Sequence, residues 1–305
     1  MNRHDLLVVL GPTASGKTRL GVFLARALGG EIISVDSRQV YRGLDLASGK
    51  DLEEYARDGA PVPFHLIDIV DLAEEYHLFA FIRDFYRAFE SIRERGHLPV
   101  AVGGTGLYLD ALLRGYGMTA VPENPALREA LQALDMNALR ERLLRLRPNP
   151  HNTTDLEDRD RCIRAIEIAE YEQAHPPTRR KPPRALVLGV RPDRGELKRR
   201  IAARLRERLD AGMVEEIEAV HASGVSWDRL DQLGLECRYV ARYLTGSIRN
   251  RNDLFQKLAA AIYQFARRQE TWFRRMERQG LVIHWLERAD PAAAAGGGAG
   301  DGPRA

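Results

Sequence analysis

The stretch Gly11-Pro12-Thr13-Ala14-Ser15-Gly16-Lys17-Thr18 directly follows a short apolar run at residues 6–10. It matches the phosphate-loop pattern G-x-x-x-x-G-K-[ST] at every specified position. In such a loop, backbone N–H groups and the N-terminus of the following helix bind phosphate oxygens. Lys17 is predicted to reach the outer phosphates and Thr18 to hold a Mg²⁺ ion. The stretch therefore predicts a strand, a phosphate-binding loop and a helix, but it does not identify the reaction.

Further apolar runs rich in β-branched residues recur along the chain, and helical patterns or turn glycines follow them. With the first run, they lie at residues 6–10, 31–35, 64–69, 98–103 and 185–190. Strands that alternate with helices favour a parallel sheet covered by helices on both faces. We therefore predict an α/β fold like that of P-loop NTPases.

The segment from about 115 to 183 has a different pattern. It lacks strand signals, is interrupted by six prolines between residues 122 and 177, and has helical patterns at 126–146 and 156–174. We predict that it is an all-helical lobe inserted into the α/β core. The core would then comprise residues 1–114 and 184–290, with two long helices at about 193–221 and 252–279. Residues 291–305 are rich in alanine and glycine and are predicted to be a disordered tail.

The composition restricts the class of protein. The net charge is +3, and no stretch approaches the ~20 apolar residues of a membrane helix. Cys162 and Cys237 are the only cysteines and lack C-x-x-C spacing, which favours a reducing cytoplasm and argues against a zinc site. We expect a cytoplasmic protein without a membrane partner.

Positive charge is concentrated in two segments. Residues 191–208 and residues 249–278 each carry eight basic and three acidic side chains. A basic face suits a polyanion such as nucleic acid, but a solvated helix face explains the charge equally well. In the first segment Arg200, Arg204 and Arg208 recur at i, i+4 and i+8, so they share one helix face.

Two further motifs follow predicted strands. Asp36-Ser37-Arg38-Gln39-Val40-Tyr41-Arg42 comes after the second strand, and Gly103-Gly104-Thr105-Gly106-Leu107-Tyr108-Leu109 ends the strand at 98–103. A carboxylate at the carboxyl end of a strand in such a sheet lies in the ligand crevice. Glycines at a strand end allow a ligand to approach the backbone, and Thr105 offers a hydroxyl group.

Six stretches, taken in order, resemble the tRNA dimethylallyltransferase family. They are GPTASGKT, DSRQVYRG, VPFHLIDI, VGGTGLYLDALL, DRDRCIRAIEI and YQFARRQETWFRR, and the resemblance runs from residue 6 to about residue 286. It implies transfer of the dimethylallyl group of dimethylallyl diphosphate to N6 of adenosine 37, next to the anticodon. The tRNAs implied read codons that begin with U. The resemblance also implies Mg²⁺ and the anticodon stem-loop as partners, and we expect a monomer.

The resemblance also implies roles for individual residues. Gly11 to Thr18 would hold the diphosphate leaving group, whose charge Lys17, Arg200, Arg204 and a Mg²⁺ ion on Thr18 would neutralise. Asp36 would accept the proton of N6, with Thr105 beside it in the catalytic set. Ser37 and Gln39 would hydrogen-bond the flipped adenine. The residues expected to contact tRNA are Asp36, Ser37, Arg38, Gln39, Thr105, Arg128, Asp160, Arg161, Cys162, Ile163 and Arg164.

Several alternatives remain open. Asp36 could instead be a carboxylate beside Mg²⁺, and Arg161 and Arg164 could pair with acidic residues on their own helix. A kinase acting on a small molecule or nucleoside, a transferase that prenylates free adenine nucleotides, or a non-catalytic RNA-binding protein would share the phosphate loop. The chain also departs from the usual family pattern. Ser48-Gly49-Lys50-Asp51 stands where most members have T-A-K-P, and Leu233-Gly234-Leu235-Glu236 where many have I-G-Y-K-E.

Overall fold

The computed structural model describes residues 4–57, 59–117, 120–148, 153–176 and 180–289. The chain divides into two compact units, of which the second is the segment Gly115–Lys181 and the first is formed by the residues on either side of it. The predicted disordered tail at 291–305 lies outside the described residues. In the described part of the chain, no helix combines the length and apolarity needed to cross a bilayer.

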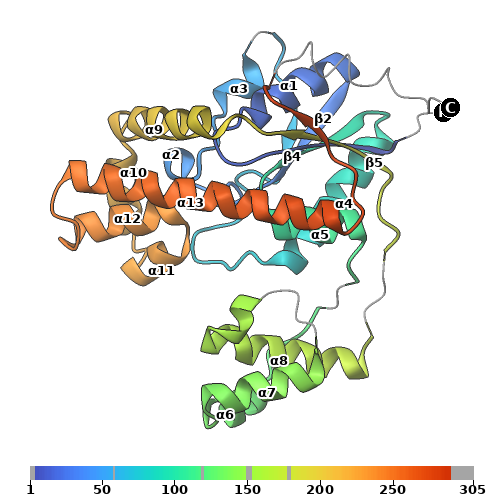
Figure 1. Cartoon of the computed structure of the whole chain (residues 1–305), viewed down its shortest axis with the longest axis vertical. Coiled ribbons are helices and arrows are strands. Elements are labelled where there is room, and N and C mark those ends of the chain that lie inside the picture. The colour runs from blue at the N-terminus through green and yellow to red at the C-terminus, as the bar shows by residue number, and fades with distance from the viewer. Residues whose placement is uncertain (1–3, 58, 118–119, 149–152, 177–179, 290–305) are drawn as a thin grey trace. The chain divides into compact units, whose positions relative to one another are not determined.

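A six-stranded, fully parallel sheet forms the centre of the first unit, in the order β3-β2-β4-β1-β5-β6 (Figure 1). This confirms the predicted fold class. The strands are β1 (Leu6–Leu10), β2 (Gly30–Val35), β3 (Phe64–His65), β4 (Leu98–Gly103), β5 (Ala185–Val190) and β6 (His284–Leu286). The sequence pattern missed β6, which has three residues and lies at the edge. The predicted strand at 64–69 stops early because Leu66 and Asp68 have φ values of +63° and +56°.

The register of the three central strands brings their ends together. Gly103 of β4 pairs with Leu10 of β1 on one side and with Val35 of β2 on the other. The next residues along the chain are Gly11, Asp36 and Gly104. Because parallel strands end at the same edge of a sheet, the three predicted site motifs leave neighbouring strands at one level.

Helices cover the two faces of this sheet. On one face, α1 (Lys17–Leu28) packs Leu20 and Ala25 against Val9 and Val102. Alternate strand residues point to the other face, where α4 (Leu78–Glu94) lies with α5 (Gly106–Arg114) beside it (Figure 1). The stacked rings of Phe81 and Tyr108, 4.2 Å apart, join these two helices.

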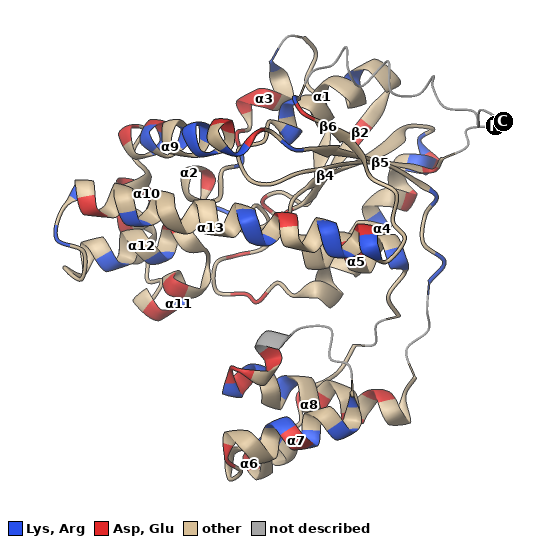
Figure 2. Ribbon diagram, viewed as in Figure 1, with Lys and Arg blue, Asp and Glu red and all other residues tan. Residues whose placement is uncertain are grey.

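A second apolar cluster in the same unit is built mainly from helices. The helices are α2 (Asp45–Ser48), α9 (Arg194–Asp210), α10 (Met213–Ala222), α11 (Trp227–Gln232), α12 (Leu235–Leu244) and α13 (Arg251–Arg278). The short helix α3 (Glu53–Ala56) is not part of this cluster and packs near the sheet. The predicted helix at 193–221 is two helices, because Gly212 adopts a φ of +102° between α9 and α10. Lys and Arg recur along α9 and α13 (Figure 2).

The second unit is helical. It contains α6 (Pro125–Gln132), α7 (Met136–Leu146), a 3₁₀ turn at Thr153–Leu156 and α8 (Arg159–Ala174). The predicted helix at 126–146 is divided, since Asp135 caps a new helix by accepting a hydrogen bond from the Ala138 N–H at 2.8 Å. Its apolar core consists of Leu131, Leu139, Leu143, Cys162, Ile163 and Ile166.

Candidate active site

The loop between β1 and α1 has the backbone geometry of an anion-binding turn. Ala14 and Gly16 lie in the left-handed region, with φ values of +61° and +90°. The helix begins at Lys17, and its N-cap residue, Gly16, has no side chain that could cap the helix. The N–H groups at the start of the helix can therefore bind a ligand, and the helix dipole favours an anion there.

The loop opens into a cleft of about 980 Å³ that lies wholly within the first unit. Most of the predicted site residues of this unit line it: Thr13, Ala14, Gly16, Lys17, Thr18, Asp36, Ser37, Arg38, Gln39, Thr105, Arg200 and Arg204. Gly11, Pro12 and Ser15 are buried beneath the surface of the loop. The structure thus gathers residues from strand-end loops and from α9, which are up to about 190 positions apart in the sequence.

Lys17 is the first residue of α1. Its ammonium group contacts the carbonyl oxygen of Pro12 at 3.3 Å. Burial lowers the pKa of Lys17 to about 8, and the charges of Arg204 and Arg208 act in the same direction, against those of Asp36 and Asp51. A multiply charged anion in the cleft would relieve this repulsion among cations. The site is therefore electrostatically prepared for a phosphate-bearing ligand.

Asp36 begins the turn after β2. Its Oδ1 atom accepts hydrogen bonds from the backbone N–H groups of Arg38 at 2.8 Å and Gln39 at 3.4 Å. The described residues supply no hydrogen-bond partner for Oδ2. One carboxylate oxygen thus fixes the side chain, while the other is left to accept a proton from a ligand in the cleft.

The neighbouring polar groups hold this turn in place. Thr105 Oγ1 accepts a hydrogen bond from the Ser37 N–H at 3.2 Å, which joins the β4 loop to the β2 loop. The amide of Gln39 accepts from Ser34 Oγ at 2.8 Å and donates to the Gly49 carbonyl at 2.9 Å. Gln39 therefore supports the segment at 48–51, in addition to any hydrogen bond that it makes with a nucleobase.

Gln269 on α13 joins two of the loops, a role that sequence analysis missed. Its Oε1 accepts from the Thr13 N–H and its Nε2 donates to the Gly104 carbonyl, both at 2.9 Å, and the side chain is buried. A Cβ atom at Gly104 would lie 2.4 Å from Nε2. The second glycine of the β4 loop is thus required for the close approach of α13.

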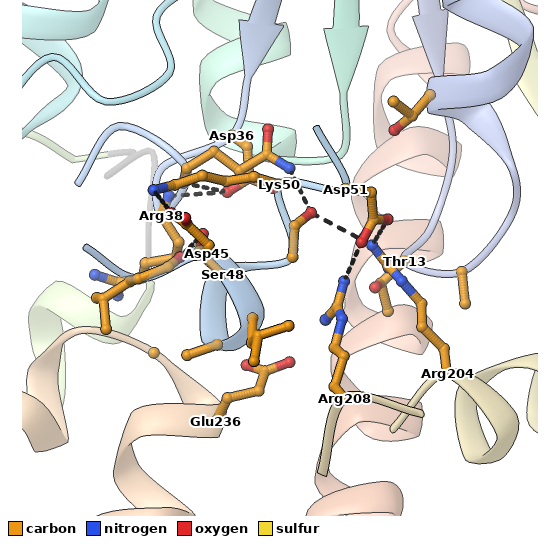
Figure 3. A pocket seen from close by; sticks show the side chains of 18 of the residues that line it. Thr13, Asp36, Arg38, Asp45, Ser48, Lys50, Asp51, Arg204, Arg208 and Glu236 are labelled. Carbon is orange, nitrogen blue, oxygen red and sulfur yellow. Dashed lines mark hydrogen bonds and ion pairs between the residues drawn. The ribbon is translucent and has the colours of Figure 1, made fainter. Parts of the chain in front are cut away.

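Arg200, Arg204 and Arg208 do share a helix face, and all three line the cleft. Arg200 donates to the Ser15 carbonyl at 3.2 Å and to Glu196 at 2.7 Å. Arg204 and Arg208 both bind the carboxylate of Asp51, the latter at 3.1 Å (Figure 3). From the sequence, Arg208 was expected only to share this helix face, and Asp51 had no expected role.

The two departures from the family pattern meet in this cleft, since both Asp51 and Glu236 line it. Burial raises the pKa of Glu236, although the charges of Arg208 and Arg204 oppose the shift. Lys50 is fully buried and binds Asp45 at 2.5 Å, with Asp68 as its second partner. The only signal for these residues in the sequence was that they lay at the departures.

The donor groups around the loop fit a Mg²⁺ ion held jointly with a phosphate ligand. Thr18 lines the cleft, and the carboxylates of Asp36 and Asp51 are close enough to act on Lys17. Mg²⁺ typically takes one or two protein oxygens, several waters and phosphate oxygens. Among the described residues there is no group of three or more His, Cys, Asp or Glu side chains that could hold a metal alone.

The second unit places its predicted tRNA-contacting residues in different environments. Cys162 and Ile163 are buried in its core, so only their backbone could meet a ligand, whereas Asp160 and Arg161 are exposed in the first turn of α8. Arg128 binds buried Glu167 at 3.0 Å, and Arg164 is its second partner. Burial alone would raise the pKa of Glu167, but hydrogen bonds from both arginines and from the Asn124 N–H lower it.

Known proteins are similar to the chain over nearly its whole length. The model of the IPP transferase family matches residues 39–276, and that of the isopentenyl transferase family matches residues 4–58. "tRNA dimethylallyltransferase 2" of Trichlorobacter lovleyi is 58% identical over 294 residues, which are 95% of each chain. The protein of the same name from Syntrophotalea carbinolica is 58% identical over 290 residues, 94% of this chain and 96% of the relative.

Solved structures agree with these sequence comparisons. The tRNA isopentenylpyrophosphate transferase of Bacillus halodurans is 30% identical, with a TM-score of 0.67 over 93% of this chain and 90% of that one. A eukaryotic dimethylallyltransferase acting on tRNA, 23% identical with a TM-score of 0.75 over 94% of this chain and 74% of that one, has the same fold. Together with the phosphate-binding loop and the two strand-end motifs that meet it in the cleft, these similarities show that the chain belongs to the tRNA dimethylallyltransferase (IPP transferase) family.

Proposed function

We propose that the protein transfers the dimethylallyl group of dimethylallyl diphosphate to N6 of adenosine 37 in tRNAs that read codons beginning with U. The observation that carries this proposal is the convergence of the phosphate loop, Asp36 and Thr105 at the ends of three adjacent strands. A diphosphate site and a carboxylate base in one cleft are what transfer from a diphosphate to an amine requires. We expect the protein to act as a monomer in the cytoplasm, where its tRNA substrate is found.

The phosphate loop and the arginines would stabilise the leaving group. As the C–O bond to the diphosphate breaks, the electron pair remains on the diphosphate. The N–H groups at the start of α1, the Lys17 ammonium and the Arg200 guanidinium, which contacts the phosphate loop at the Ser15 carbonyl, would stabilise this developing charge. A Mg²⁺ ion held by Thr18 and the diphosphate oxygens would supply further charge neutralisation.

Asp36 would act on the acceptor side. The lone pair of N6 is delocalised into the purine ring, so the amine is a weak nucleophile. A C–N bond forms between N6 and the first allyl carbon, and the surplus proton of N6 passes to Asp36 Oδ2. The adenine must leave the stack of the anticodon loop to reach this carboxylate, at a cost of a few kcal/mol.

The helical unit would bind the anticodon stem-loop, with exposed Arg161 as the phosphate contact. We expect Arg161→Gln to weaken tRNA binding and to make the slope of log K against log[salt] shallower by about one unit, because one phosphate contact is lost. Affinity measured between 50 and 200 mM salt tests this.

Two arginines serve as comparisons. Arg145→Gln on α7 removes the same charge from another exposed site of this unit and should change the slope less. Arg164→Gln should lower the melting temperature in addition to any effect on tRNA binding, since buried Glu167 loses a partner. Equal slopes for the Arg161 and Arg145 variants would place Arg161 off the interface.

The experiment that tests the reaction is mass spectrometry of nucleosides from unmodified tRNA incubated with the protein, Mg²⁺ and dimethylallyl diphosphate. We expect one adenosine beside the anticodon to gain C₅H₈. Free AMP, ADP and ATP as acceptors provide the comparison with a nucleotide prenyltransferase. Phosphate transfer from ATP without any gain of C₅H₈ would instead establish a kinase.

A further inference from the structure

Asp51 lies between two arginines at the side of the cleft. Arg204 and Arg208 both bind its carboxylate. The exposed fraction of the side chain is 29% for Asp51, 29% for Arg204 and 12% for Arg208. Burial alone would raise the pKa of Asp51, but the charges and hydrogen bonds of the two arginines together lower it. The arginines are therefore neutralised by a carboxylate of the protein itself, at a place still open to solvent.

The same cluster acts on the phosphate-binding lysine. Burial is the main cause of the lowered pKa of Lys17; the charges of Arg204 and Arg208 lower it further, and the charge of Asp51 opposes them. Arg204 follows Arg200 by one helical turn, and Arg200 contacts the phosphate loop through the Ser15 carbonyl. A diphosphate bound at Lys17 would thus lie within electrostatic range of both arginines.

The segment that carries Asp51 is firmly held. Glu216 accepts hydrogen bonds from the N–H groups of Asp45, Leu46 and Ala47 at 2.8–2.9 Å, and Gln39 binds the Gly49 carbonyl. Arg208 packs against Gly49 so closely that a Cβ atom there would lie 1.9 Å from its Nη2. Asp51 itself has a φ of +47°. With the carboxylate fixed, the long arginine side chains are the groups able to change partner.

We propose that Asp51 is an internal counter-anion that holds Arg204 and Arg208 in the free protein, competes with the diphosphate for them, and thereby limits how tightly the diphosphate product is retained. The inference rests on the proposed function, because it needs a diphosphate in the phosphate loop. When the C–O bond breaks, the diphosphate gains negative charge and would hold the arginines more strongly. A competing carboxylate at fixed distance offsets this gain and favours release.

Binding of inorganic pyrophosphate, measured by calorimetry on the full chain with Mg²⁺, tests the proposal without any turnover. Asp51→Asn keeps the shape of the side chain and removes its charge. We expect its dissociation constant for pyrophosphate to fall by about tenfold, as one competing charge is removed. Pyrophosphate should also inhibit the variant more strongly than it inhibits the unmodified protein.

Glu207→Gln is the matched control. Glu207 lines the same cleft and is exposed, and its side chain has no hydrogen bond or ion pair with the described residues. Its loss should leave pyrophosphate affinity nearly unchanged, whereas an equal gain in affinity for both variants would reduce the effect to net charge and overturn the proposal. Asp51→Ser serves as a second variant if Asp51→Asn does not fold.

A weaker, rather than tighter, binding of pyrophosphate by the Asp51 variants would overturn the proposal. If Asp51 merely orients the arginines for the ligand, both Asp51 variants bind pyrophosphate more weakly, and the counter-anion role is overturned while the diphosphate site stands. If the unmodified protein does not bind pyrophosphate at all, the diphosphate site itself is overturned, and the competition with it.

Discussion

The Lys17→Ala variant is expected to bind dimethylallyl diphosphate at least about 10²-fold more weakly than the unmodified protein. Hydrogen bonds to charged groups contribute about 1.5–3 kcal/mol each, and each 1.4 kcal/mol is tenfold in affinity. The ammonium group contacts the phosphate loop, where burial lowers its pKa and the charges of Arg204 and Arg208 act in the same direction. A diphosphate bound in the loop would lie close to this ammonium group, and the loss of two charged hydrogen bonds from it to phosphate oxygens accounts for the expected fall in affinity. Calorimetry with the donor alone measures it.

A second lysine separates this effect from a general loss of charge. Lys198 on α9 is exposed and is not among the residues that line the cleft, so Lys198→Ala should bind the donor normally. The melting temperature of both variants reports whether the fold is intact. Unchanged donor affinity in a folded Lys17→Ala protein would contradict the assignment of the loop as the diphosphate site.

The fold was predictable because its signals are local. The phosphate-loop pattern and five apolar runs each report on fewer than ten consecutive residues, and they gave the parallel sheet and the loop that opens the cleft. Where prediction failed, longer-range packing or single backbone angles decide. Strand β6 has three residues and forms only because β5 lies beside it, and the break between α9 and α10 depends on Gly212. Neither leaves a periodic pattern in the sequence.

The site was predictable only where a motif carried it. Lys17, Asp36 and Thr105 belong to motifs at strand ends, and the structure brings them to one cleft. Asp51 and Gln269 depend on contacts with residues more than 150 positions away, which no sequence spacing reveals. Arg164 was expected from the resemblance to contact tRNA, with an ion pair on its own helix as the open alternative, and the structure shows that pair with buried Glu167.

Asp36 is the residue on which the proposed chemistry most depends, and Asp36→Asn isolates its role. The asparagine retains an Oδ1 atom that can accept from the Arg38 and Gln39 N–H groups, so the turn should persist. It loses the basicity of the second oxygen, which the described residues leave without a partner. We expect the single-turnover rate with bound tRNA and donor to fall by about 10²–10⁴-fold, the range of general-base loss. The affinities for both substrates should remain within about threefold, since the geometry is kept.

The concentration of Mg²⁺ distinguishes this role from its main rival. If Asp36 serves chiefly to hold the metal, saturating Mg²⁺ should restore much of the lost rate, whereas a lost base leaves the rate low at every concentration. Glu53→Gln supplies the matched control, because Glu53 is an exposed carboxylate that lines the same cleft. A non-catalytic RNA-binding protein would show no turnover to lose and equal tRNA affinity in all variants. A full rate in Asp36→Asn at ordinary Mg²⁺ would show that Asp36 does not accept the proton. Another carboxylate of the cleft would then be the base, and Glu236, whose pKa burial raises, would be the first of them to substitute.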